Sequence, residues 1–261
     1  MTSATAAEIK SCCAGAYASP AARYLLGDSF HPGGTELTSE LGRSLRLGPD
    51  ALAADIGSGP GTSALQLARE TGCRIVGVEI AAASVAEAKQ KAHAAGLAAR
   101  VEFLQGDAEA LPLPDASIDG VLSECALCMF PEKRSAAREF ARVLRPGGRF
   151  ALSDMTAAQE RLSAGLRSLS GWVACIGGAE RLETLVQLLS DSGLAVEHAE
   201  QRDRLLAELL ERIEARLRAA RMLALPGLDG QIERGLQLAG TARAALARGD
   251  LGYAVVLGYR P

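Results

Sequence analysis

This 261-residue sequence has no long apolar run. No stretch approaches the roughly eighteen consecutive apolar residues of a membrane-spanning helix, and the first residues lack the basic-then-apolar order of a secretory signal. The chain is long enough to bury a sizeable core. We therefore expect a cytoplasmic protein with no membrane partner.

The sequence also lacks an excess of one charge. Its 28 Lys and Arg residues almost balance 31 Asp and Glu residues, which gives a net charge of -3. Nothing in this balance recruits nucleic acid or an acidic surface. The expected partner is a small molecule.

The six cysteines do not indicate a disulfide framework. A reducing compartment keeps thiols free in a chain of this size and type. Free cysteine packs as a small hydrophobe, and Cys73, between an expected helix and strand, fits that role.

A glycine-rich loop is the most distinctive segment of the chain. Residues 53–62 read AADIGSGPGT, an apolar run that ends in an acid and opens onto three alternate glycines. Glycine lets a ligand approach bare main chain. A helix that begins directly afterwards offers N–H donors and partial positive charge, so this loop is a candidate site for a polar ligand.

Residues 51–155 predict alternating strands and helices, the pattern of a parallel, doubly wound α/β sheet. The expected strands are 51–56, 74–79, 101–105, 118–124 and 148–155, and the expected helices are 62–71, 82–95 and 131–144. Beyond them we expect helices at 161–169 and 182–192 and strands at 194–200 and 253–259.

An acid stands at the end of three successive expected strands: Asp55, Glu79 and Asp107. The carboxyl ends of parallel strands share one edge, where ligands bind. Glu79 lies about twenty residues past the first glycine, where nucleotide-binding α/β folds place a carboxylate against ribose hydroxyls.

Two segments extend this core. Residues 1–48 are expected to form a helical lid, with the irregular segment 26–35 ahead of a helix at 36–45. Residues 49–261 form the main domain, with a long helical insert at about 202–250 whose leucines recur at helical spacing. Such a stripe is typical of packing or of a dimer face, and a homodimer through the insert is one expectation.

Four segments together resemble class I S-adenosylmethionine-dependent methyltransferases: residues 55–61, Glu79, residues 106–108 and residues 145–149. The resemblance covers about residues 50–155. A NAD-binding Rossmann protein normally has the spacing G-x-G-x-x-G, whereas position 62 here is threonine. The resemblance implies a Rossmann-like seven-stranded sheet whose last two strands form an antiparallel hairpin, and S-adenosylmethionine as cofactor. No metal is required for methyl transfer.

The same resemblance implies how the cofactor is held. The glycines approach its methionine part, Asp55 orders the loop or the ammonium group, and Glu79 accepts both ribose hydroxyls. Asp107 accepts a hydrogen bond from the exocyclic amine of adenine, while the Ala108 main-chain N–H donates one to the ring. The full expected set is Asp55, Gly57, Ser58, Gly59, Gly61, Glu79, Ile80, Asp107, Ala108 and Ser123.

The acceptor side is expected at residues 123–128, SECALC, at the end of the fourth strand. The Asn-Pro-Pro-Tyr signature of DNA and protein amide methylases does not occur there. A general base, Glu124 or His31, is one option for this side of the site. A thiol site is the other.

A narrower resemblance is to arsenite methyltransferases, of the methyltransferase type 11 group. It is carried by residues 123–127, 130–134, 140–148, 153–154 and 175–179, the last reading CIGGA. It implies that Cys125 and Cys175 are ligand thiols, with a third thiol, Cys12 or Cys13, supplied by the lid. Glu124 departs from the family's asparagine, and the helical insert replaces the family's C-terminal segment.

Trivalent arsenic is soft and takes three thiolates in a pyramid, which leaves its lone pair to attack the methyl group. Methylation oxidises arsenic, and a cysteine pair could return the electrons by closing a disulfide. Three functions stay open. They are methyl transfer to thiol-bound arsenic, C- or O-methylation of a small organic acceptor as in quinone and sterol methyltransferases, and non-catalytic binding of cofactor or soft metal.

Overall fold

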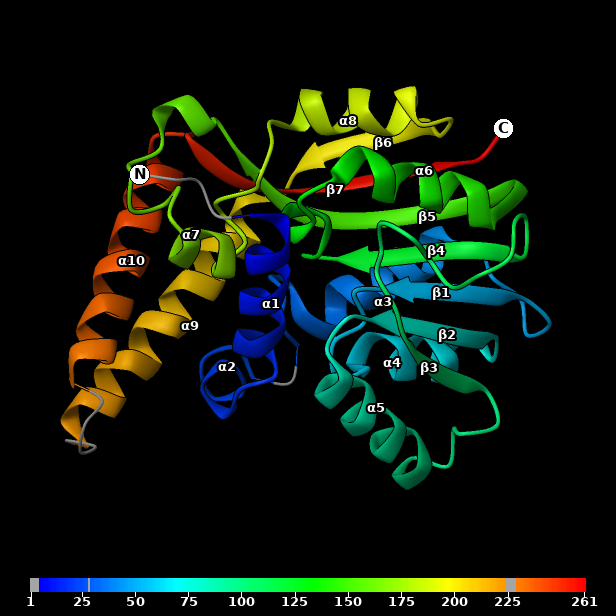
Figure 1. Cartoon of the computed structure of the whole chain (residues 1–261), viewed down its shortest axis with the longest axis horizontal. Helices are drawn as coiled ribbons and strands as arrows, with labels where there is room; N and C mark the ends of the chain where they lie inside the picture. Colours follow the sequence, from blue (N-terminus) through cyan, green and yellow to red (C-terminus); the bar gives the residue numbers. More distant parts are fainter. Residues whose placement is uncertain (1–4, 28, 224–228) are drawn as a thin grey trace.

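A seven-stranded sheet in the order β3-β2-β1-β4-β5-β7-β6 organises the computed structural model, which describes residues 5–27, 29–223 and 229–261 (Figure 1). The strands are β1 (Leu52–Ile56), β2 (Arg74–Glu79), β3 (Val101–Gln105), β4 (Ile118–Glu124), β5 (Leu144–Ala157), β6 (Ala195–Gln201) and β7 (Leu251–Tyr259).

Strands β1 to β5 pair in parallel, whereas β7 is antiparallel to both β5 and β6. The expected sheet and its antiparallel last pair are therefore confirmed. The strand order reverses at β1, which lies between β2 and β4. Ligands of open α/β sheets bind at the carboxyl ends of the strands beside such a reversal. The loops after the neighbouring strands β1 and β4 lie at this edge, so they are the expected ligand site.

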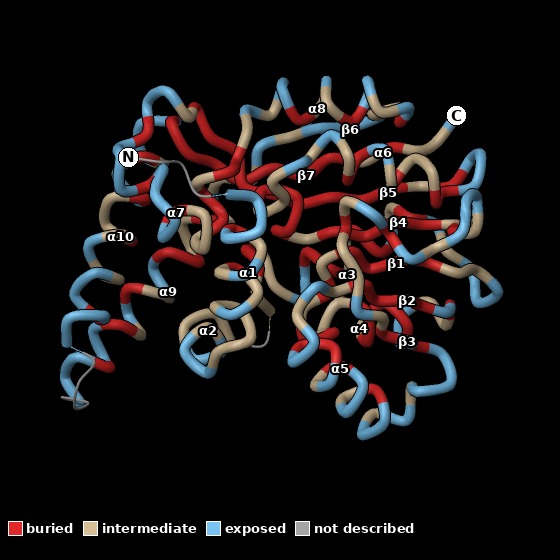
Figure 2. Tube along the Cα trace, viewed as in Figure 1, coloured by how far each residue is buried: buried red, intermediate tan, exposed pale blue. Residues whose placement is uncertain are grey.

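Two hydrophobic cores cover the two faces of the sheet. Along β1, Ala53 belongs to one core and Ala54 to the other, as the two-residue period of a strand requires. Helices α3 (Gly34–Ser44), α4 (Thr62–Thr71) and α5 (Ala82–Ala94) pack on the first face, and α6 (Lys133–Val143) and α8 (Leu182–Asp191) on the second. Figure 2 shows β1, β2, β4, β5 and β7 largely buried between these layers, whereas the edge strand β6 is partly exposed.

The helix expected at residues 161–169 is wrong. The structure has a 3-10 turn, η2 (Gln159–Arg161), and a short helix, α7 (Leu169–Val173). Between them the chain folds back, so that a Cβ on Gly171 would lie 1.8 Å from the carbonyl oxygen of Leu166. The Ser163 hydroxyl accepts from the Leu166 N–H, a local bond that competes with helix formation. Strand β5 is also longer than the expected strand 148–155, because it includes residues 144–147 and 156–157 as well.

The N-terminal residues form α1 (Ala6–Tyr17) and α2 (Pro20–Leu26); that they act as a lid stays a prediction. Thr5 and Glu8 close a capping box that starts α1. Helix α1 lies beside α7 and the 3-10 turn η1 (Leu127–Met129), over the carboxyl end of the sheet (Figure 1). Residues 1–4 and Asp28, within the expected lid, lie outside the described residues.

The helical insert is a pair of long helices, α9 (Asp203–Met222) and α10 (Asp229–Ala247), which pack on each other and on β7. Residues 224–228 of the insert lie outside the described residues. Glu214 is buried between the two helices and pairs with Arg218 at 2.7 Å and Arg243 at 3.4 Å. None of the helices among the described residues is long and apolar enough to cross a membrane. The homodimer stays a prediction.

Candidate active site

The glycine loop after β1 lines a pocket at the carboxyl edge of the sheet. Gly57, Gly59 and Gly61 have φ of 76°, 51° and 81°, all in the left-handed region. A Cβ on Gly57 would lie 2.6 Å from Ala126, and one on Gly61 2.5 Å from Phe103. A Cβ on Gly59 would meet only the Phe30 ring, at 4.0 Å, so Gly59 presents bare main chain to the pocket, whereas Gly57 and Gly61 are also required by packing.

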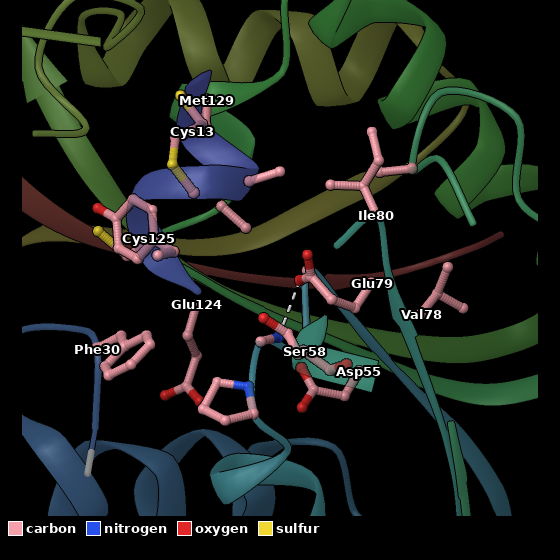
Figure 3. A pocket seen from close by; sticks show the side chains of 18 of the residues that line it. Cys13, Phe30, Asp55, Ser58, Val78, Glu79, Ile80, Glu124, Cys125 and Met129 are labelled. Carbon is pink, nitrogen blue, oxygen red and sulfur yellow. Dashed lines mark hydrogen bonds between the residues drawn. The ribbon is translucent and has the colours of Figure 1, made fainter. Parts of the chain in front are cut away.

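The three strand-end acids, Asp55, Glu79 and Asp107, all line this pocket. Figure 3 shows Asp55 and Glu79 beside the loop, with Ser58 between them. Sequence reasoning placed these side chains at one edge because parallel strands end there together.

Glu79 is fixed by main-chain donors. Its carboxylate accepts from the Gly59 N–H at 3.0 Å and the Ala81 N–H at 2.8 Å. Burial raises its pKa, and these two hydrogen bonds oppose the rise. The carboxylate is held at the pocket wall, where it can accept a hydrogen bond from a hydroxyl group of a ligand.

Asp55 is buried with one unsatisfied oxygen. Its Oδ2 has no hydrogen-bond partner among the described residues. Burial first, and then the neighbouring Glu124, raise the pKa of Asp55 well above its usual value. A buried acid without a partner fits a cationic or hydrogen-bond-donating ligand, and the ammonium of S-adenosylmethionine is such a group.

Asp107 contacts helix α1. Lys10 of α1 donates to Asp107 at 2.6 Å and also pairs with Glu109. Sequence reasoning missed Lys10, because no local pattern links it to a strand end 97 residues away. Helix α1 is therefore fastened across one end of the pocket.

A cluster of three thiols adjoins the other end of the pocket. The Sγ atoms of Cys125, Cys128 and Cys175 lie within 4.8 Å of one another, and all three residues are buried. Cys125 also lines the pocket. Cys125 and Cys175 have positive φ, 53° and 62°, which costs a non-glycine residue about 1 kcal/mol each. Strain of this kind clusters at functional sites.

The thiols are linked by hydrogen bonds. The Tyr17 hydroxyl of α1 lies 2.9 Å from Cys175 Sγ. Hydrogen bonds from Cys125 and Cys128, with Tyr17, lower the pKa of Cys175, whereas burial raises the pKa of Cys128. The Cys128 N–H also donates to buried Asp154 at 2.8 Å, and burial raises the pKa of Asp154 to about 7.

The predicted thiols are thus only partly brought together. Cys125 and Cys175 meet, while Cys13 lies on the pocket wall outside the cluster and Cys12 is half-buried and does not line the pocket. Burial, and then the charge of Cys175, raise the pKa of Cys13 to about 12. Sequence reasoning missed Cys128, because the family resemblance matched Cys125 and Cys175 alone. The sequence feature that could have identified Cys128 is a second cysteine three residues after Cys125.

A second pair of polar side chains lines the same pocket. His31 Nε2 lies 3.5 Å from Glu124 Oε1, and both side chains are at most 5% exposed. The Thr38 hydroxyl donates to Glu124 at 3.1 Å. The two candidate bases named from the sequence therefore form one buried pair.

Of the remaining expected cofactor residues, Ser58, Ile80 and Ala108 line the pocket. Ser123 does not; its hydroxyl donates to the Ile56 carbonyl at 2.9 Å and ties β4 to β1. The structure thus places Ser123 behind the site.

Comparison with known proteins defines the class of this site. A family model described as a methyltransferase domain matches residues 54–152. The chain is 32% identical over 232 residues to the 27-O-demethylrifamycin SV methyltransferase of Amycolatopsis mediterranei, which covers 87% of this chain and 84% of that protein. The protein belongs to the S-adenosylmethionine-dependent methyltransferase family.

Two further proteins are informative. An arsenite methyltransferase of Halobacterium salinarum is 33% identical over 159 residues, 59% of this chain but only 40% of that protein. The fold matches phosphoethanolamine N-methyltransferase 2 of Haemonchus contortus, solved with S-adenosyl-L-methionine, with a TM-score of 0.76 at 20% identity over 95% of this chain and 57% of that chain. S-Adenosylmethionine is the cofactor.

Proposed function

We propose that this methyltransferase transfers the methyl group of S-adenosylmethionine to trivalent arsenic held by its own thiols. The observation that carries the proposal is the meeting of Cys125 and Cys175. They are 50 residues apart, yet Cys175 Sγ lies 3.6 Å from the Cys125 carbonyl oxygen, and their thiols belong to one buried cluster. Both are the positions that the resemblance to arsenite methyltransferases selected.

The position of the cluster supports the proposal. Cys125 directly follows β4 and lines the pocket that Asp55, Glu79 and the glycine loop also line. An acceptor held by Cys125 therefore shares one cavity with the proposed cofactor residues. Positioning of donor and acceptor in one water-poor cavity is the main contribution that a protein makes to methyl transfer.

The cofactor supplies a methyl group activated on a sulfonium. We assign Asp55 to the ammonium, Glu79 to the ribose hydroxyls and Asp107 with Ala108 to the adenine. Gly59 offers main chain to the methionine part, because it lines the pocket and a Cβ there would meet only the Phe30 ring, at 4.0 Å. Ser58 and Ile80 complete this wall of the pocket.

The thiolates hold trivalent arsenic and leave its lone pair free. That lone pair forms the new arsenic–carbon bond while the methyl–sulfur bond of the donor breaks, and arsenic loses two electrons in the formal sense. Two cysteine thiolates return these electrons when they close a disulfide, which a reduced external dithiol reopens.

The test is transfer of labelled methyl from S-adenosylmethionine to arsenite in the presence of a dithiol. We expect methylated arsenic from the wild type and none from Cys125→Ser or Cys175→Ser. Cys73→Ser is the matched control, because Cys73 is buried elsewhere, against Thr71, and should leave the rate unchanged. Wild-type protein that binds cofactor yet leaves arsenite unmethylated would refute the proposal.

A second candidate is methylation of a hydroxyl on an organic acceptor. The buried His31–Glu124 pair favours it, since a histidine that faces a carboxylate in the pocket can take the proton of an attacking hydroxyl. The likeness to a rifamycin-derivative methyltransferase points the same way.

The two candidates separate by mutation. If the acceptor is a hydroxyl, His31→Ala should lower kcat about 100- to 10,000-fold on that acceptor, the usual range for loss of a general base. Cys175→Ser should then have little effect. If arsenic is the acceptor, the order of the two effects reverses.

A further inference from the structure

We infer that the third arsenic ligand is Cys128, so that Cys125, Cys128 and Cys175 form one preassembled three-thiol site for a soft trivalent metalloid. The inference rests on the proposed function and names the ligand set of the same site. It replaces the lid cysteine that the sequence suggested.

The positions of the thiols carry this inference. Among the described residues, the three Sγ atoms lie within 4.8 Å of one another. Cys125 and Cys128 are fixed three residues apart around η1, and Cys175 reaches them from the turn after α7. Three sulfur atoms this close can surround one arsenic atom after small rotations of their side chains.

Main-chain geometry holds the site before any ligand arrives. Cys125 and Cys175 keep left-handed backbone conformations, and the Cys125 N–H donates to the Ser153 carbonyl at 2.7 Å. The Cys128 N–H is held by Asp154. Backbones fixed in this way lower the entropy that the thiols lose when they bind.

Helix α1 contacts the three-thiol site without supplying a sulfur to it. Cys13 lies on the pocket wall outside the thiol group, whereas Tyr17 of the same helix contacts Cys175 Sγ. Helix α1 therefore covers the site through a hydroxyl and leaves the three sulfur positions to residues of the main domain.

Binding balances without an oxidant or reductant. Arsenous acid, As(OH)3, exchanges its three hydroxides for three thiolates; each departing hydroxide takes one thiol proton and leaves as water. Three arsenic–oxygen and three sulfur–hydrogen bonds break while three arsenic–sulfur bonds form. Arsenic stays trivalent with its lone pair intact.

Arsenic-edge X-ray absorption on the full chain with one equivalent of arsenite, without cofactor, tests the ligand set. We expect three sulfur neighbours in the wild type and two sulfurs with one oxygen in Cys128→Ser. Arsenite affinity should fall about 10- to 100-fold, a loss that even an outer partner of a metal ligand can cause. Cys12→Ser and Cys13→Ser, the matched controls, should keep three sulfurs and the wild-type affinity.

The outcomes separate this inference from the proposed function. Three sulfurs in Cys128→Ser, or a lost sulfur in Cys13→Ser, would overturn the inference even if methylation continued. Three sulfurs in the wild type without methylated arsenic would refute the proposed function and leave the ligand set standing. If Cys128→Ser does not fold, Cys128→Ala and the two lid variants still decide between Cys128 and Cys13.

Discussion

At the scale of single residues, two acids around the glycine loop differ in how fully they are hydrogen-bonded. Glu79 is satisfied by two main-chain N–H groups, whereas Asp55 keeps an oxygen without a partner among the described residues. A satisfied carboxylate positions a ligand, while an unsatisfied one costs stability until a ligand arrives. Substitutions of Glu79 and Asp55 are therefore expected to have different effects.

Glu79→Ala should weaken S-adenosylmethionine binding by about 2–3 kcal/mol, because hydrogen bonds to a charged group are lost. Isothermal titration calorimetry measures this change. Glu102→Ala is the matched control, since Glu102 is an exposed acid on the neighbouring strand β3. This variant should bind S-adenosylmethionine with the same affinity as the wild type. Equal affinity in the Glu79 variant would remove this residue from the site.

Asp55→Asn should stabilise the cofactor-free protein, and more so as pH rises. The folded protein raises the pKa of Asp55 above its value of about 3.9 in the unfolded chain, so folding is disfavoured once the carboxyl ionises. The penalty starts above about pH 4 and is complete above the raised pKa. Thermal melts of both proteins at several pH values measure it, and a gain that does not grow with pH would contradict the prediction.

At the scale of elements, the turn from β1 into α4 depends on Gly61. This residue is the left-handed N-cap of α4, and its Cα faces Phe103 of β3 and Ala88 of α5. The alternate glycines were visible in the sequence. Which of them faces a ligand and which faces the core was not, because that depends on Phe103, some forty residues away in a strand two places along the sheet.

Gly61→Ala should destabilise the fold by about 2–4 kcal/mol, since strain at positive φ adds to the displacement of Phe103. Gly147→Ala separates the two causes: Gly147 has φ of 79° but nothing within 4 Å of an added Cβ. It should cost about 1–2 kcal/mol, the conformational strain alone. Urea unfolding gives both values, and equal losses would show that contact with Phe103 does not matter.

The thiol site shows the same limit of sequence reasoning. Strand periodicity and acids at strand ends predicted the sheet and the pocket, because both follow from local patterns. Cys175 came from a family resemblance, and Cys128 was missed because that resemblance matched Cys125 and Cys175 alone. The expected helix at 161–169 failed for a local reason, since the chain folds back and packs Gly171 against the main chain of Leu166.

At the scale of the whole molecule, the helical insert is continuous with the main core. Leu206 of α9 and Ala242 of α10 belong to the same hydrophobic cluster as Leu65 of α4 and Cys125. Figure 1 shows the two helices beyond the end of the sheet where α1 and α7 lie. The insert therefore supports the acceptor side of the site and should unfold with it.

Leu206→Ala should lower the stability of the whole chain by about 2–5 kcal/mol, the cost of a cavity at a leucine that is 2% exposed. Circular dichroism follows all the helices, and the fluorescence of the single tryptophan, Trp172 in α7, follows the acceptor side. Both midpoints should shift together. Leu223→Ala, at a position 69% exposed, should change neither by more than about 0.5 kcal/mol. A shift confined to circular dichroism would show that the insert unfolds independently, and its support of the thiol site would then be excluded.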